Sequence, residues 1–141
     1  MYKLRRVDIE RSGVLFGKID AYVREVVNQL NPYLIVLFGS FATDDVNEGS
    51  DIDIMVVADF KEVFLERIKR LMDMNTFKIP IEPVGYRLEE FREMMKRKSP
   101  FVMEVMEKGK IMHKRNEISN SPNFGDKIIR SNRNLDNAKP N

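Results

Sequence analysis

The apolar run Tyr33–Phe38, with the sequence YLIVLF, constrains the fold more than any other stretch of this 141-residue chain. It contains β-branched and aromatic side chains, and Pro32 and Gly39 bound it. A continuous run of this kind is typical of a strand that is buried on both faces, because a strand with one solvated face alternates polar and apolar residues. Such a strand needs helices over both faces of its sheet, which predicts an α/β or α+β domain.

Helical periodicity flanks this strand. Apolar residues recur at steps of three and four residues in several segments, which is typical of amphipathic helices. Predicted helices cover residues 16–30, 60–74, 88–97 and 100–108. Asn31-Pro32 ends the first of them, Ser99 and Pro100 are typical of a helix start, and Gly109 is typical of a helix end.

Three further strands are predicted. Residues 51–57, with the sequence DIDIMVV, place an apolar side chain at every second position. Residues 77–86 carry Pro80 and Pro83, and since proline cannot donate a hydrogen bond to a neighbouring strand, any strand here lies at a sheet edge. Residues 111–112 add a short strand. Together these elements predict a small mixed β-sheet with packed helices.

Length and composition indicate one folded domain. The chain has 141 residues, 43% of them hydrophobic, which is enough for one core and too little for two. From residue 116 onward the chain is rich in Asn and Ser and has no clear apolar period. We therefore expect a domain over residues 1–115 and a disordered tail over residues 116–141.

Charge and cysteine content exclude several classes of protein. Lys and Arg number 24 against 22 Asp and Glu, and a net charge of +2 does not indicate strong general binding to nucleic acid. The chain has no cysteine, which excludes disulfides, thiolate zinc sites and cysteine nucleophiles. The longest apolar run is far shorter than a membrane span, and the N-terminus lacks a signal peptide. We expect a cytoplasmic protein without a membrane anchor.

Two aspartates in the second predicted strand indicate a metal site. Asp51 and Asp53 are two residues apart, so their side chains point to the same face of a strand, while Ile52 and Ile54 anchor the opposite face. Two carboxylates on a rigid strand suit Mg²⁺, which takes one or two protein carboxylates and completes its octahedron with water and substrate phosphates.

A phosphate site is predicted beside them. Gly39-Ser40 follows the buried strand, where glycine lets the backbone approach an anion and free N–H groups and a hydroxyl can bind phosphate. Ser50, directly before Asp51, is predicted to bind the nucleotide together with Gly39 and Ser40. A phosphate cradle next to metal-binding carboxylates suits nucleotidyl transfer, and Glu82 is the best candidate for a third acid.

The segment GSFATDDVNEGSDID, residues 39–53, resembles the Gly-Ser, ten residues, Asp-x-Asp signature of the DNA polymerase β-like nucleotidyltransferase superfamily. The strands on either side resemble its minimal nucleotidyltransferase branch, and the resemblance covers roughly residues 15–113. It implies that Asp51 and Asp53 are metal ligands, that Gly39 and Ser40 hold the triphosphate, and that Glu82 is the third carboxylate, acting as ligand or base.

The resemblance implies a reaction and partners. The protein would transfer a nucleoside monophosphate from an NTP, with ATP the expected nucleotide, to an acceptor hydroxyl and release pyrophosphate. Two Mg²⁺ ions, or Mn²⁺ in their place, would serve as cofactors. The acceptor-binding half would come from a second copy of the chain or from a small helical HEPN protein. Such pairs resemble toxin–antitoxin modules in which the nucleotidyltransferase modifies and silences its partner.

Two alternatives remain open at this point. Many relatives continue Gly-Ser with x-Ala-Arg-Gly, whereas this chain has Phe41 to Asp44, FATD. That departure favours a catalytically inactive module of the same fold that binds a nucleotide or a partner. A glycosyltransferase also uses Asp-x-Asp to hold a metal and a nucleotide sugar, but this chain is short for such a domain.

Overall fold

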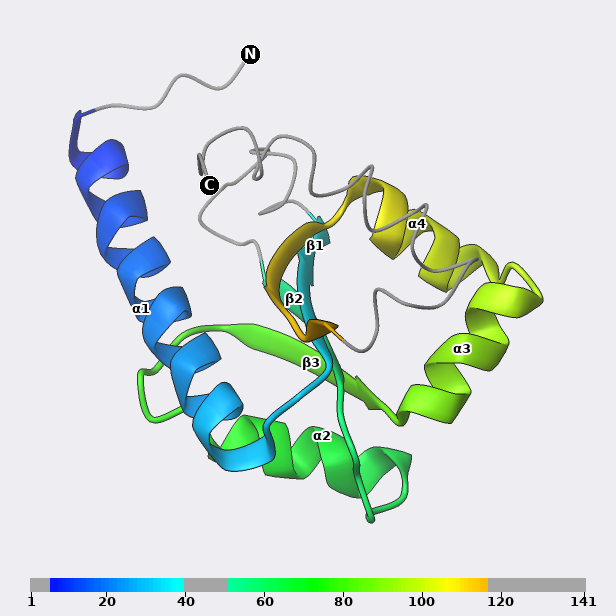
Figure 1. Cartoon of the computed structure of the whole chain (residues 1–141). Helices are drawn as coiled ribbons and strands as arrows, with labels where there is room; N and C mark the ends of the chain where they lie inside the picture. Colours follow the sequence, from blue (N-terminus) through cyan, green and yellow to red (C-terminus); the bar gives the residue numbers. More distant parts are fainter. Residues whose placement is uncertain (1–5, 40–50, 117–141) are drawn as a thin grey trace.

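The fold is a mixed sheet between two layers of helices (Figure 1). The computed structural model describes residues 6–39 and 51–116. The elements in order are α1 (Arg6–Leu30), β1 (Leu34–Phe38), β2 (Ile52–Val57), α2 (Phe64–Asp73), β3 (Ile81–Tyr86), α3 (Leu88–Lys96), α4 (Pro100–Lys108) and β4 (Lys110–Lys114). The predicted α/β class, with a small mixed sheet and packed helices, is confirmed.

Strand β1 lies inside the sheet, as its apolar run predicts. The strand order is β3-β2-β1-β4. β1 pairs antiparallel with both β2 and β4, whereas β3 pairs parallel with β2. The side chains from Leu34 to Leu37 are at most 1% exposed, so both faces of β1 are covered.

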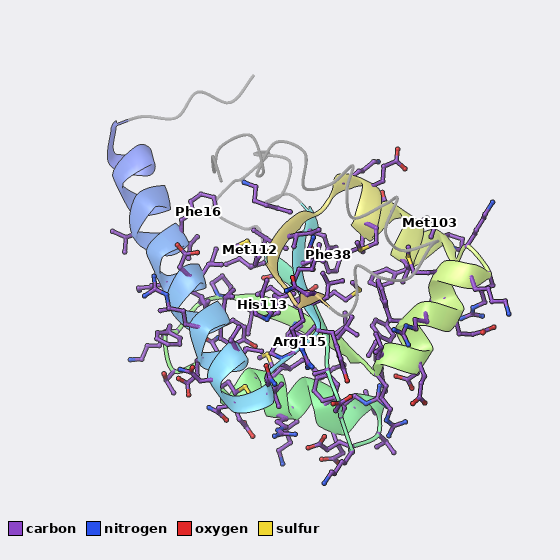
Figure 2. All side chains as sticks on the ribbon, in the orientation of Figure 1. Phe16, Phe38, Met103, Met112, His113 and Arg115 are labelled. Atoms are coloured by element: carbon purple, nitrogen blue, oxygen red, sulfur yellow. The ribbon has the colours of Figure 1, made fainter. Side chains whose placement is uncertain are left out.

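Alternate residues of the strands pack in two separate cores, one on each face of the sheet. In the first core, Ile35 and Leu37 of β1 pack with α1 and α2. In the second core, Leu34 and Val36 pack with α3 and α4. Figure 2 labels Phe16 and Met112, which belong to the first core, and Phe38 and Met103, which belong to the second. The sheet therefore carries one apolar layer on each face, as its near-continuous apolar strands require.

A buried hydrogen bond joins α1 to α2 within the first core. The Tyr22 hydroxyl, on a fully buried side chain, donates to the carbonyl oxygen of Leu71 at 2.7 Å. Burial raises the pKa of Tyr22 well above its usual range, so this phenol stays protonated and remains a donor. The bond gives the polar tip of a core aromatic residue a partner, as burial requires.

Strand β3 lies at an edge of the sheet, as its prolines predict. Pro83 pairs with Ile54 of β2. Because no further strand lies beyond β3, no neighbouring strand needs the N–H that proline lacks. Helix α2 connects β2 to β3, which is the crossover that two parallel neighbouring strands need.

Two helices begin at other residues than predicted. Helix α1 begins at Arg6, ahead of the apolar pattern, and arginine and glutamate, which occur in this first part, are good helix formers. Helix α2 begins at Phe64 rather than at Phe60. Phe60 is 3% exposed, and its carbonyl accepts a hydrogen bond from Arg87 Nε at 2.8 Å, so this residue belongs to the connection that docks on the core.

Gly109 ends α4 for a different reason from the usual left-handed cap. Its φ is −75°, which any residue adopts. A Cβ at this position would lie 2.5 Å from Val36 Cγ1 and would also clash with the backbone, so only glycine lets α4 turn into β4 this close to β1. Ser99 stands at the N-cap of α4 without a side-chain capping bond, and Pro100 occupies the first turn as predicted.

Three methionines and the histidine contact the interior of the fold. Met94, Met95 and Met106 are at most 8% exposed and pack in the second core. His113 Nε2 lies 3.2 Å from the carbonyl oxygen of Pro32. Within the two described ranges, no helix is both long and apolar enough to cross a membrane.

Arg67 is a buried cation that links three elements. It is 3% exposed and donates to Glu90 Oε1 of α3 at 2.7 Å, to the Gly85 carbonyl of β3 at 3.1 Å and to the Glu62 carbonyl at 2.7 Å. Its guanidinium lies 5.7 Å from the centroid of the Phe60 ring. A buried charge persists only when it is paired and hydrogen-bonded, so this network stabilises the position of α2 against β3 and α3.

Glu90 is the ionised partner in this network. Burial by itself would raise the pKa of the Glu90 carboxyl, but hydrogen bonds from Arg67 and from the Arg87 backbone, with the charges of both arginines, lower it below its ordinary value of 4.5. Since the folded pKa is lower than the unfolded one, the ionised carboxylate stabilises the fold above pH 4.5 and loses that contribution as the pH falls further.

We expect Glu90→Gln to lower the free energy of unfolding at pH 7 by about 1–3 kcal/mol, because it leaves the buried Arg67 guanidinium without a charged partner while Glu90 itself is partly exposed. The difference between wild type and variant should shrink between pH 7 and pH 3. Urea denaturation across this range measures both. Glu93→Gln, at an exposed position of the same helix, is the control. A pH-independent difference would contradict the assignment.

Candidate active site

Three carboxylates meet at one end of the sheet. Asp53 of β2 pairs with Phe38 of β1 on one side and with Glu82 of β3 on the other. Directly paired residues of neighbouring strands project to the same face. Asp51, directly ahead of β2, joins them through a side-chain hydrogen bond with Glu82.

The opposite face of β2 holds the strand in place. Ile52 and Ile54 are at most 1% exposed and pack in the core beneath α1. Met55, on the same face as Asp53, packs beneath α3 and α4. Asp51 and Asp53 therefore lie at the end of the α3/α4 face. Their strand is anchored from both sides, whereas the sequence predicted only the anchoring by Ile52 and Ile54.

The negative charges at this end of the sheet act on one another. Burial raises the pKa of Asp53, a hydrogen bond with Glu82 lowers it, and the charge of Asp51 raises it, with a net increase above its ordinary value of 3.8. The pKa of Glu82 is raised by a hydrogen bond with Asp51 and by the charges of Asp51 and Asp53. Crowded carboxylates of this kind retain protons more strongly, and a cation between them would relieve the repulsion.

Gly39 brings the end of β1 against these carboxylates. Its φ of +78° lies in the left-handed region that favours glycine. A Cβ at this position would collide with Asp53 Oδ2 and lie 3.2 Å from Asp53 Cγ. The backbone that follows β1 thus approaches the Asp53 carboxylate as closely as it does because residue 39 has no side chain.

The described residues bring together four of the six predicted site residues: Gly39, Asp51, Asp53 and Glu82. The other two, Ser40 and Ser50, lie outside the described residues, as does the FATD segment that departs from the relatives. The roles of Ser40 and Ser50 therefore stay predictions from the sequence.

The donor set fits a cation that is shared with a phosphate ligand. In the part of the chain that the structure describes, no group of three or more His, Asp or Glu side chains could hold a metal ion by itself. Mg²⁺ does not require such a group, because it commonly takes one or two carboxylates and fills the remaining positions with water and substrate phosphates. Asp51 and Asp53 can provide this partial shell.

An aromatic pair next to the carboxylates was not predicted from the sequence. The ring of Phe38, whose backbone pairs with Asp53, stands edge-on to the ring of Phe101 of α4, with 5.6 Å between centroids and an interplanar angle of 83°. Phe38 is the last residue of the apolar run, and Phe101 directly follows the helix-start signal at Pro100. Neither of these sequence features predicts that the two rings touch, because the contact depends on where α4 crosses the sheet.

Known proteins share this architecture. The crystal structure of a candidate nucleotidyltransferase from Sulfolobus solfataricus is similar, with a TM-score of 0.54, 20% sequence identity, and coverage of 77% of this chain and 88% of that one. A toxin–antitoxin structure with AMP-PNP is similar with a TM-score of 0.50, 20% identity, and coverage of 84% and 90%. At this identity the likeness establishes the fold. The curated proteins contain no match to the chain.

A protein family is identified from the sequence itself. The sequence profile described as the nucleotidyltransferase domain matches residues 21–120, which is more than half of the chain and includes every predicted site residue. The resemblance drawn from Gly39-Ser40 and Asp51-x-Asp53 is thereby confirmed. The chain belongs to the nucleotidyltransferase domain family.

Proposed function

We propose that this protein transfers a nucleoside monophosphate from an NTP to an acceptor hydroxyl and releases pyrophosphate. The observation that carries the proposal is the convergence of Gly39, Asp53 and Glu82 from three neighbouring strands at one sheet end. A backbone turn that can approach phosphate, placed against carboxylates that can share a cation with phosphate, is the arrangement that phosphoryl-group transfer needs.

Each residue has a distinct role in this proposal. Asp51 and Asp53 would hold Mg²⁺, or Mn²⁺ in its place, and Gly39 with Ser40 and Ser50 would hold the triphosphate. Two bound metal ions supply activation of the attacking oxygen and stabilisation of the leaving group in an in-line displacement. Strand β2 keeps both aspartates in position, because its other face is anchored by Ile52 and Ile54.

Glu82 would act as the third carboxylate, as ligand or as general base. Its position beside Asp53 in the pairing of β2 with β3 places a proton acceptor next to the proposed metal ligands. In the proposed step the acceptor oxygen attacks the α-phosphorus, the bond from that phosphorus to the bridging oxygen of the β-phosphate breaks, and the acceptor proton passes to the Glu82 carboxylate.

ATP is the proposed nucleotide, and a helical HEPN protein is the proposed partner. The similar toxin–antitoxin structure that contains AMP-PNP supports an adenine nucleotide and a protein partner. The resemblance to the minimal nucleotidyltransferases supports modification of that partner as the way in which it is silenced.

Transfer of label tests the reaction. With Mg²⁺ and α-³²P-labelled NTPs, the wild-type protein should label an acceptor that co-purifies with it, and Asp53→Asn should lower this transfer by about 100-fold or more because a metal ligand is lost. Asp73→Asn, at an exposed position of α2, should leave the transfer unchanged.

The same assay separates the main alternative. If the wild type transfers no label but binds NTP in a metal-dependent manner that Asp53→Asn abolishes, the protein is a binding module of this fold. Turnover of a nucleotide sugar would instead indicate a glycosyltransferase.

Glu82→Gln separates a role in the chemical step from a role in binding. If Glu82 accepts the proton, single-turnover transfer should slow by about 100- to 10,000-fold while the affinity for a non-hydrolysable ATP analogue changes little. Glu89→Gln, at an exposed position of α3, is the control. An unchanged transfer rate would make Glu82 a surface acid of an edge strand.

Gly39→Ala tests the close approach of the backbone to Asp53. We expect a loss of about 1–2 kcal/mol in unfolding free energy from the left-handed φ. We also expect weaker Mg²⁺-dependent nucleotide binding, because the new Cβ displaces the Asp53 carboxylate. Gly17→Ala, where a Cβ meets nothing within 4 Å, should instead stabilise α1 by about 0.5–1 kcal/mol. Urea denaturation and calorimetric titration measure the two effects, and unchanged binding would contradict the proposed contact.

A further inference from the structure

A row of aromatic rings leads away from the carboxylates. It begins at Phe38, which is paired with Asp53, and continues to Phe101. The Phe101 ring lies 6.2 Å from the ring of Tyr86, and Tyr86 lies 5.7 Å from the ring of Phe64. Phe101 thus contacts Phe38, the residue that pairs with Asp53. Phe64 is the last ring of the row.

Phe101 is unusual among the apolar residues of α4 because it is exposed. Its exposed fraction is 36%, whereas Val102, Val105 and Met106 of the same helix are at most 3% exposed. Contacts with Phe38 and Tyr86 hold the ring on two sides while part of its surface remains in water. An aromatic surface held in this way costs little further side-chain entropy when a flat ligand stacks on it.

We propose that Phe101 stacks on the base of the donor NTP, an inference that rests on the proposed function of the carboxylate site. The α-phosphate of the donor must lie at Asp51 and Asp53, and only the ribose separates this phosphate from the base. The base is the flat, partly apolar end of the nucleotide, and among the described residues Phe101 is the exposed aromatic side chain in direct contact with Phe38. Aromatic side chains bind bases through such stacking.

The chemistry of the ring implies a limited selectivity. A phenyl ring offers no hydrogen-bonding group to a base edge, so stacking on Phe101 discriminates by the size of the base and not by its donor and acceptor pattern. Purine nucleotides should therefore bind more tightly through Phe101 than pyrimidine nucleotides.

The chain contains no tryptophan, which allows a direct test. Phe101→Trp introduces a single indole fluorophore, and Phe64→Trp places the same fluorophore at the exposed ring that ends the row. Each variant is titrated, with Mg²⁺, against AMP-PNP and against inorganic tripolyphosphate, which shares the phosphates and lacks the base. We expect AMP-PNP, and not tripolyphosphate, to quench the fluorescence at position 101, and neither ligand to quench it at position 64.

Calorimetry on the wild type and on Phe101→Leu supplies the second measurement. Loss of one stacking contact should weaken AMP-PNP binding about 5- to 150-fold and leave tripolyphosphate binding unchanged. Unchanged tripolyphosphate binding also shows that the variant is folded.

The outcomes separate the inference from the function on which it rests. If the wild type binds AMP-PNP but position 101 shows no quenching and Phe101→Leu binds as tightly, the base lies elsewhere and the inference is wrong, while the proposed function stands. If the wild type binds neither AMP-PNP nor tripolyphosphate in the presence of Mg²⁺, the proposed function fails and the inference fails with it.

Discussion

The pairing of Asp53 with Phe38 and Glu82 is the constraint on which the site depends. This register sets a half-buried carboxylate between two strands, directly beside a second acid, at the place where β1 ends. Carboxylates held together in this way repel one another, and their raised pKa values reflect that repulsion. The strands nevertheless keep them together, because apolar packing on both faces of the sheet outweighs the local electrostatic cost. A cation bound between these carboxylates would relieve their repulsion.

Both faces of the sheet carry an apolar core, but only one of them also carries the carboxylates of the site. Helix α1 covers one face with a core that contains the tyrosine bond to Leu71, and no carboxylate of the site projects into it. On the other face α3 and α4 cover the middle of the sheet, and α4 brings Phe101 beside Phe38 at the end that carries Asp53. The buried Arg67 joins α2, β3 and α3, so the edge strand that carries Glu82 is attached to its neighbours by more than its own ladder. This attachment matters because β3 lies at the sheet edge and has a neighbouring strand on one side only.

Local sequence patterns predicted the fold well, but they did not predict contacts between residues that are distant in the chain. The apolar run of β1 and the prolines of β3 indicated an inner and an edge strand, and both are confirmed. The predicted start of α2 at Phe60 was wrong, because the helix begins at Phe64. Phe60 fits the helical spacing of apolar residues, but it lies in the connection before the helix and is buried. Arg67 could not be recognised as buried, since an arginine within an amphipathic pattern is exposed in most proteins. The contact of Phe101 with Phe38 depends on how α4 crosses the sheet, and no local pattern encodes that crossing.

The sequence by itself determined that Asp51 and Asp53 share one face of a strand and that Gly39 follows a buried one, because the period of a strand and the end of an apolar run are local properties. The spacing between them was also sufficient to indicate the family. Only the tertiary structure decided that Gly39 contacts the Asp53 carboxylate, that Glu82 pairs with Asp53, and that Phe101 stands beside Phe38. These neighbours are distant in the chain, and their register depends on the packing of helices on both faces of the sheet, which is a property of the whole domain.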